Sequence, residues 1–275
     1  MTILMSDKGY IKSRFECCLN PYEITGYLKH AYMYMGNKPK DQRVLYHYSN
    51  IDCIYNILRK GYIWLSSISS MNDYLESEFY NSSCSDRHLY FSSFSRFEEN
   101  LAMYKMYGDK DSGASLKVNY SDMMRVVNDS RICDSEYYDA IVVCNGIETD
   151  MHIKVNLYLT AVCYKELHSN ILKAGTVSNN LISDPLNNPE LAGFVKLDGW
   201  EFENEVRLCA VTKNDLGTNK IAIRIPTELI KNVEVVKCPG FDNYKNKNTL
   251  SKLRRLGISV RESEYESLVN LNKLS

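Results

Sequence analysis

Hydrophobic and polar positions between residues 44 and 66 follow a regular order of strand and helix. A short apolar run is followed by isoleucine and leucine at helical spacing, and then by a second apolar run. Ser49 or Asn50 is expected to cap the helix at its start, and Gly61 to end it. The predicted elements are a strand at 44–48, a helix at 51–60 and a strand at 62–66.

Further elements follow from the same two periods. Alternation over residues 200–210 predicts a strand with Glu201, Glu203, Glu205 and Arg207 on one face. The middle of the chain, 121–189, shows no clear pattern. The other predicted strands are 88–94, 113–118, 220–225, 233–236 and 258–260, and the other predicted helices are 21–36, 98–107 and 249–256.

This order of elements predicts an α+β fold with mixed, largely antiparallel sheets and flanking helices. We find no internal repeat and no clear linker. The expected organisation is a helical N-terminal lead at residues 1–42, followed by a single catalytic-type α+β domain at 43–275.

Charge argues against a protein that binds nucleic acid mainly through its phosphates, and hydropathy argues against a membrane-spanning protein. The 33 lysines and arginines nearly balance the 34 acidic residues, giving a net charge of −1, whereas proteins that bind nucleic acid through its phosphates normally carry a basic excess. A local basic patch around Lys252, Arg254 and Arg255 stays open as an alternative. No apolar stretch approaches the roughly 20 residues of a membrane-spanning helix.

Cysteine usage indicates a reducing compartment. The nine cysteines are scattered, with no C-x-x-C pair, so neither a metal site nor a disulfide framework is expected. The first ten residues lack the apolar core of a signal peptide. We therefore expect a cytoplasmic protein without a metal, and export by a leaderless secretion route stays open as an alternative.

The first segment with candidate chemistry is Tyr46-His47-Tyr48-Ser49. Alternation along a strand turns His47 to one face and the two tyrosine rings to the other. An imidazole and aromatic rings suit a flat, polar ligand, although a single histidine on a strand is more often structural.

Two further segments are polar. Asn72-Asp73-x-x-Glu76 is most often a turn or a helix cap, and it supplies too few ligands for a metal. In Phe91-Ser92-Ser93-Phe94-Ser95, Ser93 and Ser95 share one side of a strand. Tyr104 and Tyr107 share a helix face, and core packing explains them equally well.

The fourth segment, residues 196–207, gives the strongest signal. Three glutamates on one strand face repel one another, so at least one pKa should rise unless Arg207 or a ligand compensates. An exposed edge strand tolerates the same pattern. A Glu-x-Glu pair is also the arrangement that holds a ribose hydroxyl and stabilises an oxocarbenium-like centre.

Taken in order, these segments resemble a widespread bacterial domain family of unknown function that is associated with abortive-infection defence. The shared features are a Tyr-x-Tyr strand, an Asn-Asp-x-x-Glu loop, a Phe-Ser strand, an aromatic-x-x-Tyr-Gly helix end and a Trp-x-x-Glu-x-Glu-x-Arg strand. They fall here on residues 46–48, 72–76, 91–95, 104–108 and 200–207.

The same order is similar to the ADP-ribosyltransferase fold, in which NAD is the substrate. That resemblance implies that His47 binds a ribose of NAD, that Ser49 or Ser93 lines the nicotinamide pocket, and that Glu205, beside Glu203, orients the ribose hydroxyl. A ring from Tyr62, Tyr104 or Tyr107 would stack on nicotinamide. One departure is that the Gly or Glu usual after the histidine is absent. The implied catalytic residues are Glu205, Glu203 and His47, and the implied NAD-binding residues are Tyr46, Tyr48, Ser49, Tyr62, Asn72, Asp73, Ser93, Ser95, Tyr104, Tyr107 and Arg207.

Two functions are therefore predicted. The first is an NAD-consuming transferase or glycohydrolase that acts as a toxin or anti-phage defence effector. The second is a non-enzymatic nucleotide-binding sensor or protein-interaction module. Expected partners are a nucleotide, an acceptor protein or nucleic acid, and a neutralising or regulatory protein; no membrane is expected.

Overall fold

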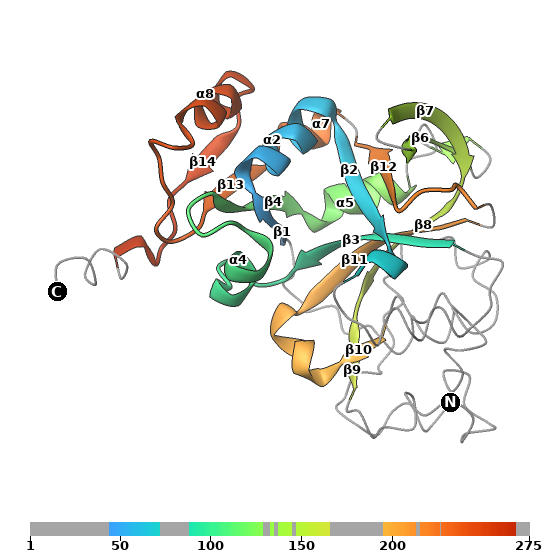
Figure 1. Ribbon diagram of the computed structural model, residues 1–275, viewed down its shortest axis with the longest axis horizontal. Helices are drawn as coiled ribbons and strands as arrows, with labels where there is room; N and C mark the ends of the chain where they lie inside the picture. The colour runs from blue at the N-terminus through green and yellow to red at the C-terminus, as the bar shows by residue number, and fades with distance from the viewer. Residues whose placement is uncertain are drawn as a thin grey trace. The chain divides into compact units, whose positions relative to one another are not determined.

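The computed structural model describes residues 44–71, 88–128, 133–134, 137–144, 147–165, 195–212, 215–225 and 227–267 (Figure 1). These residues form an α+β protein in which most strand pairs are antiparallel. The predicted lead at 1–42 and the Asn72-Asp73 segment lie outside the described residues, so both stay predictions.

The chain divides into two compact units that share the sequence in alternation. The first unit comprises Met1–Asp41, Trp64–Ser93 and Met124–Arg224, and the second comprises Gln42–Ile63, Phe94–Met123 and Ile225–Ser275. Strands β2 (Tyr62–Ser67) and β3 (His88–Ser95) each cross the boundary. Whether residues 43–275 behave as one domain stays a prediction.

The second unit is built on four central strands. β4 (Gly113–Asn119) lies between β1 (Val44–Asn50) and β13 (Glu234–Lys237), antiparallel to both. β14 (Ser259–Arg261) continues parallel to β13. The helices of this unit are α2 (Ile51–Lys60), α4 (Leu101–Tyr107), α7 (Thr227–Ile230) and α8 (Lys247–Arg255), and α5 (Tyr120–Asn128) begins in it.

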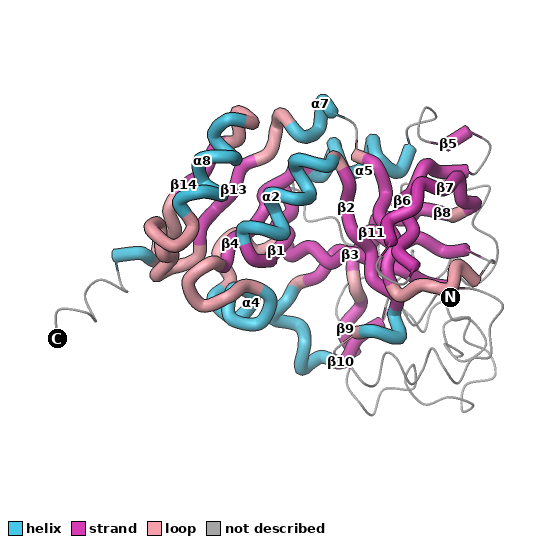
Figure 2. Tube along the Cα trace, turned by 45° about the horizontal axis from the view of Figure 1, so that its top comes forward, coloured by secondary structure: helices cyan, strands magenta, loops and turns pink. Residues whose placement is uncertain are grey.

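The first unit holds most of the remaining strands; strands are drawn in magenta in Figure 2. β3 pairs with β2 and with β11 (Glu205–Thr212), and β11 pairs antiparallel with β8 (Asn156–Ala161). The others are β5 (Cys133–Asp134), β6 (Tyr137–Cys144), β7 (Ile147–Lys154), β9 (Cys163–Lys165), β10 (Val195–Leu197) and β12 (Lys220–Arg224), with short 3-10 turns η2 (Ile68–Ser70) and η3 (Asp198–Glu203).

Helix α2 shows why the first predictions are confirmed. The side chain of Asn50 accepts a hydrogen bond from the Cys53 backbone N–H at 2.8 Å, which caps the first turn. Gly61 ends the helix with φ of 68°, a left-handed conformation that glycine adopts without a steric penalty. The inward face is Ile51, Ile54, Ile57 and Leu58, at the spacing read from the sequence.

The predicted strand at 200–210 is wrong over its first half. Residues Asp198–Glu203 form the 3-10 turn η3, and Asn204 takes a positive φ of 43° before β11 begins at Glu205. Asparagine tolerates that left-handed conformation better than most residues. Phe202 is 37% exposed, so the apolar alternation that suggested a strand lacks a core to face.

The helix predicted at residues 98–107 begins three residues later than the sequence pattern predicts. α4 starts at Leu101, because the Asn100 side chain accepts hydrogen bonds from the backbone N–H groups of Ala102 and Met103. The strands predicted near 88–94, 113–118, 220–225, 233–236 and 258–260 and the helix near 249–256 are confirmed within a few residues.

Candidate functional site

The first unit buries a cluster of four charged side chains beside one serine. We call this set the Glu205 cluster: Ser93, Lys196, Glu203, Glu205 and Arg207. Its charged members are 1–6% exposed. Two acids and two bases balance, so the cluster is neutral as it stands.

A guanidinium fork holds the central carboxylate. Arg207 donates from Nε to Glu205 Oε1 at 2.7 Å and from Nη2 to Oε2 at 3.0 Å. Both residues lie on β11, two positions apart, and therefore point to the same face. The guanidinium also stacks over the Phe91 ring, 4.1 Å from its centroid. Bidentate pairing of this kind fixes the carboxylate in both position and orientation.

Ser93 completes the contacts from the neighbouring strand. Its hydroxyl donates to Glu205 Oε1, and β3, which carries it, pairs with β11. Ser93 is half-buried, whereas the carboxylate behind it is 2% exposed. Among the members of the cluster, Ser93 is therefore the group most accessible to a ligand.

Lys196 neutralises the second carboxylate. Its Nζ lies 2.6 Å from Glu203 Oε2 and 3.6 Å from Glu205 Oε2. The ammonium also lies 4.5 Å from the centre of the Trp200 ring. Lys196, on β10, thus links the start of the 195–205 segment to Glu203 and Glu205 at its end.

These charges set the ionisation of the central glutamate. Burial by itself raises the pKa of Glu205, but the charges of Arg207 and Lys196, with hydrogen bonds from Arg207 and Ser93, lower it to about 2. The repulsion among the glutamates is therefore compensated by the positive charges of Arg207 and Lys196. Glu205 is an anion and a hydrogen-bond acceptor at neutral pH.

Only part of the predicted acidic face exists. Glu203 and Glu205 both join the cluster, but Glu203 reaches it from η3 and not from a strand. Glu201 is exposed on the same turn. The predicted single face of three glutamates is wrong, because the 3-10 turn rotates successive side chains by about 120° where a strand alternates them.

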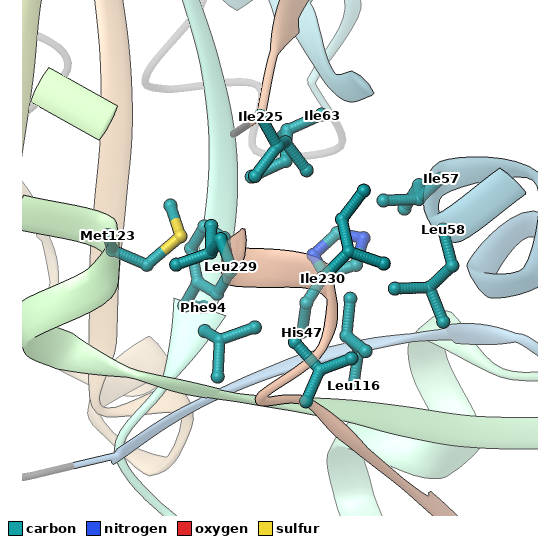
Figure 3. Close-up of a pocket in the computed structure, with 12 residues that line it drawn as sticks. His47, Ile57, Leu58, Ile63, Phe94, Leu116, Met123, Ile225, Leu229 and Ile230 are labelled. Atoms are coloured by element: carbon teal, nitrogen blue, oxygen red, sulfur yellow. The ribbon is translucent and has the colours of Figure 1, made fainter. Parts of the chain in front are cut away.

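His47 lies in the second unit, at an apolar cavity (Figure 3). Its ring contacts Phe94 with centroids 5.5 Å apart. The empty volume is ≈ 360 Å³, open solvent at its mouth included, and all other lining side chains are apolar. The predicted role of His47 toward a ribose stays a prediction.

Three of the predicted tyrosines are buried in the second unit, each 4–5% exposed. The Tyr48 hydroxyl accepts from the Asn100 N–H at 3.0 Å and lies 2.7 Å from the carbonyl oxygen of Phe97. The Tyr48 and Tyr104 rings meet edge to face at 4.8 Å. Burial and the nearby Glu98 raise the pKa of the third, Tyr46. These contacts give Tyr48 and Tyr104 a structural role, and the proposed contact of all three rings with NAD stays a prediction.

The other predicted residues are dispersed. Ser95 is buried and accepts from the Phe97 N–H at 3.1 Å. Ser49, Tyr62 and Tyr107 are each half-buried in the second unit. Their predicted contacts with a nucleotide also stay predictions.

The residue that sequence reasoning missed is Lys196. It stands seven positions before Glu203, an odd spacing that would put the two side chains on opposite faces of a strand, and the turn between them brings the two together. A lysine within a few residues of several glutamates was the available signal, but any surface ion pair gives the same signal.

The described part of the chain holds no group of three or more His, Cys, Asp or Glu residues arranged for a metal ion. Within the same residues, no helix is long and apolar enough to cross a membrane.

Comparison with known proteins gives only distant matches. No protein-family model matches the chain, and no curated protein does. Solved structures of Thermus sp. 2.9 DarT are similar over most of the chain. The complex with ADP-ribosylated ssDNA has a TM-score of 0.34 at 12% identity, covering 84% of this chain and 98% of that chain. The complex with NAD+ has a TM-score of 0.32 at 13% identity, covering 82% and 96%. At these TM-scores the similarity assigns neither fold nor function, and the chemistry of the Glu205 cluster is the basis for a functional assignment.

Proposed function

We propose that the protein consumes NAD and transfers ADP-ribose to an acceptor or to water, with Glu205 as the catalytic carboxylate. The observation that carries this proposal is the hydrogen bond from the half-buried Ser93 hydroxyl to the ionised Glu205. A ribose hydroxyl is the same kind of donor as a serine hydroxyl. It replaces Ser93 on Oε1 without leaving the carboxylate short of a hydrogen bond.

The charge state of Glu205 fits this reaction. The bond between ribose C1′ and the nicotinamide nitrogen breaks, and its electron pair stays on the nitrogen. The acceptor atom then bonds C1′ and loses its proton to solvent water. Positive charge develops on the ribose in the transition state. Because its pKa is lowered to about 2, Glu205 stabilises that charge as an anion and has no proton to give as a general acid.

Arg207 and Lys196 act as positioning residues in this scheme. The fork from Arg207 prevents the carboxylate from rotating, and Lys196 holds Glu203 beside it. Because the carboxylate is held in place beforehand, it stabilises the positive transition state without reorganising during the reaction.

Consumption of NAD inside a cell harms that cell. The proposed biological role is therefore that of a toxin or anti-phage effector in the bacterial cytoplasm, held in check by a neutralising partner. Induced expression of the wild type is expected to stop bacterial growth, and expression of Glu205→Gln is not.

The direct test is release of nicotinamide from NAD, with and without protein and nucleic-acid acceptors. Glu205→Gln keeps the shape of the side chain and removes its charge, and it is expected to lower the rate about 100-fold or more. Glu201→Gln, an exposed change of the same kind on the same segment, is the matched control and should keep the wild-type rate. If Glu205→Gln does not fold, Ser93→Ala tests the same site with every charge pair in place. Because a ribose hydroxyl is proposed to take the position of the Ser93 hydroxyl, this variant should bind NAD at least as tightly as the wild type, and weaker binding would contradict the proposal.

A second function is favoured by a different observation. All four charges of the cluster are buried and paired with one another, which is also how a purely structural ion network is built. If the protein is a non-enzymatic nucleotide sensor, calorimetry should detect NAD binding and no nicotinamide should be released. Absence of both release and binding would overturn the enzyme and the sensor together.

A further inference from the structure

The second unit presents a face with unbalanced positive charge. Between Asn243 and Arg261 the chain has six cations and no acidic residue, although its net charge is −1 overall. Helix α8 carries four of these cations, and all four are exposed. They are Lys247, Lys252, Arg254 and Arg255. Among the described residues, no carboxylate forms an ion pair with any of them.

Helix α2 extends this face. The two helices are joined by the hydrogen bond from Thr249 Oγ1 to Asp52, at 2.5 Å. Lys252 of α8 and Arg59 of α2 both lie over the Tyr55 ring, at 5.4 and 6.0 Å from its centre. We call the exposed cations of α8, with Arg59 and the two tyrosines Tyr55 and Tyr244, the α8 face.

Helix stability explains only part of the charge. Cations in the last turn interact favourably with the helix dipole, which accounts for Lys252, Arg254 and Arg255. Lys247 stands in the first turn, where a cation is unfavourable and where α8 has no acidic residue. The helix dipole therefore does not account for Lys247.

An exposed aromatic ring identifies the kind of partner. Tyr244 is 89% exposed, in the turn that leads into α8, and Lys245 and Lys247 follow it in the sequence. Proteins that bind single strands combine a cationic surface for the phosphates with aromatic rings on which unpaired bases stack. A duplex keeps its bases stacked on one another and leaves such a ring unused. An acidic peptide also uses the cations but has no base to stack.

We propose that the α8 face binds single-stranded nucleic acid, with the cations on successive phosphates and Tyr244 against a base. This surface belongs to the second unit and the Glu205 cluster to the first, so binding at the α8 face does not depend on the proposed NAD chemistry.

The test is fluorescence anisotropy of a 5′-labelled, mixed-sequence single strand of about 12 nucleotides. If four cations contact phosphates, affinity is expected to fall about 50-fold between 50 and 200 mM salt. Lys252→Glu should weaken binding and make the salt dependence less steep. Its matched control is Lys220→Glu in the first unit, which reverses the charge of a lysine that also lies over a ring, that of Trp64 at 4.8 Å.

The aromatic contact has its own pair of variants. Tyr244→Leu is expected to weaken binding about tenfold with an unchanged salt slope. Tyr265→Leu, at a 39% exposed tyrosine of the same unit, should leave binding unchanged. All four variants change exposed positions, and circular dichroism verifies that each remains folded.

Three results would overturn the proposal. The first is the absence of salt-dependent binding, and the second is an equal loss of affinity in Lys252→Glu and Lys220→Glu. The third is that polyglutamate of equal charge displaces the strand while Tyr244→Leu leaves binding unchanged. The last result assigns the face to an acidic protein. Loss of NAD turnover in Glu205→Gln with normal strand binding leaves the proposal intact.

Discussion

The Glu205 cluster and the α8 face use the same residue types in opposite ways. In the cluster, Lys196 and Arg207 are buried, and each is matched to a carboxylate. On the α8 face, exposed lysines and arginines have no carboxylate partner among the described residues. Buried charge must be paired to be tolerated, whereas exposed charge is hydrated and is free to meet a partner.

The difference separates contributions to folding from contributions to binding. Removing one partner from a buried pair leaves the other charge buried and uncompensated, so the cost appears as lost stability. Removing an exposed cation costs little stability and appears as lost affinity. Variants on the two sides of this contrast can therefore be told apart by measuring stability.

The largest effect is expected from Arg207→Met, which keeps a long apolar side chain and removes the fork. Glu205 is then buried without its main counter-charge, and the free energy of unfolding should fall by about 3–5 kcal/mol. Urea denaturation measures the loss. Arg254→Met on α8 is the matched control and should change stability by no more than about 0.5 kcal/mol. Similar losses in the two variants would remove the contrast.

The second effect concerns pH. The pKa of Glu205 is about 2 in the folded protein against 4.5 ordinarily, so its contribution to stability is complete above pH 4.5 and is lost as the pH falls toward 2. The full contribution is about 3 kcal/mol. The stability difference between wild type and Glu205→Gln should therefore shrink from pH 6 to pH 3. Denaturation at both values, with Glu201→Gln as control, measures it. A constant difference would show that charge is not what holds Glu205.

The smallest effect is expected from Tyr48→Phe, which tests a buried polar group that carries no charge. The hydroxyl bonds the backbone around Asn100 and Phe97, and its loss should cost about 1–2 kcal/mol. The loss should be the same at low and high salt, because both partners are neutral. Tyr244→Phe removes an exposed hydroxyl and provides the control in the same denaturation assay. A loss as large as that of Arg207→Met would contradict the prediction.

Local chemistry made much of the second unit predictable from sequence. The signals for helix α2 all lie within a few residues of one another: Asn50, the isoleucines of α2 and Gly61. The N-cap, the buried face and the end of the helix could therefore be predicted from the sequence. The basic character near Lys252 and Arg255 was equally visible. Its consequence was not, because the nearby Tyr55 and Arg59 come from a helix about 200 residues earlier.

The candidate site was only half predictable. Ser93, Glu203, Glu205 and Arg207 were all named, but their arrangement depends on β3 pairing with β11 and on the turn η3. Alternating apolar residues at 200–202 imitated a strand, and only the positive φ of Asn204 reveals the break. Lys196 stands an odd number of positions before Glu203, which on a strand would separate the two side chains, so their pairing depends on the folded turn.

The alternation of the two units along the sequence has a consequence for synthesis. β4 pairs with β13, and Lys117 of β4 lies opposite Glu234 of β13, 117 positions later in the chain. The central strands of the second unit can therefore pair only after β13 has been synthesised. At ribosomal rates of roughly 5–20 residues per second, that interval lasts about 6–23 seconds. No single truncation within the middle of the chain spares either unit. A nascent chain stalled or cleaved before β13 therefore carries neither a finished second unit nor a complete α8 face.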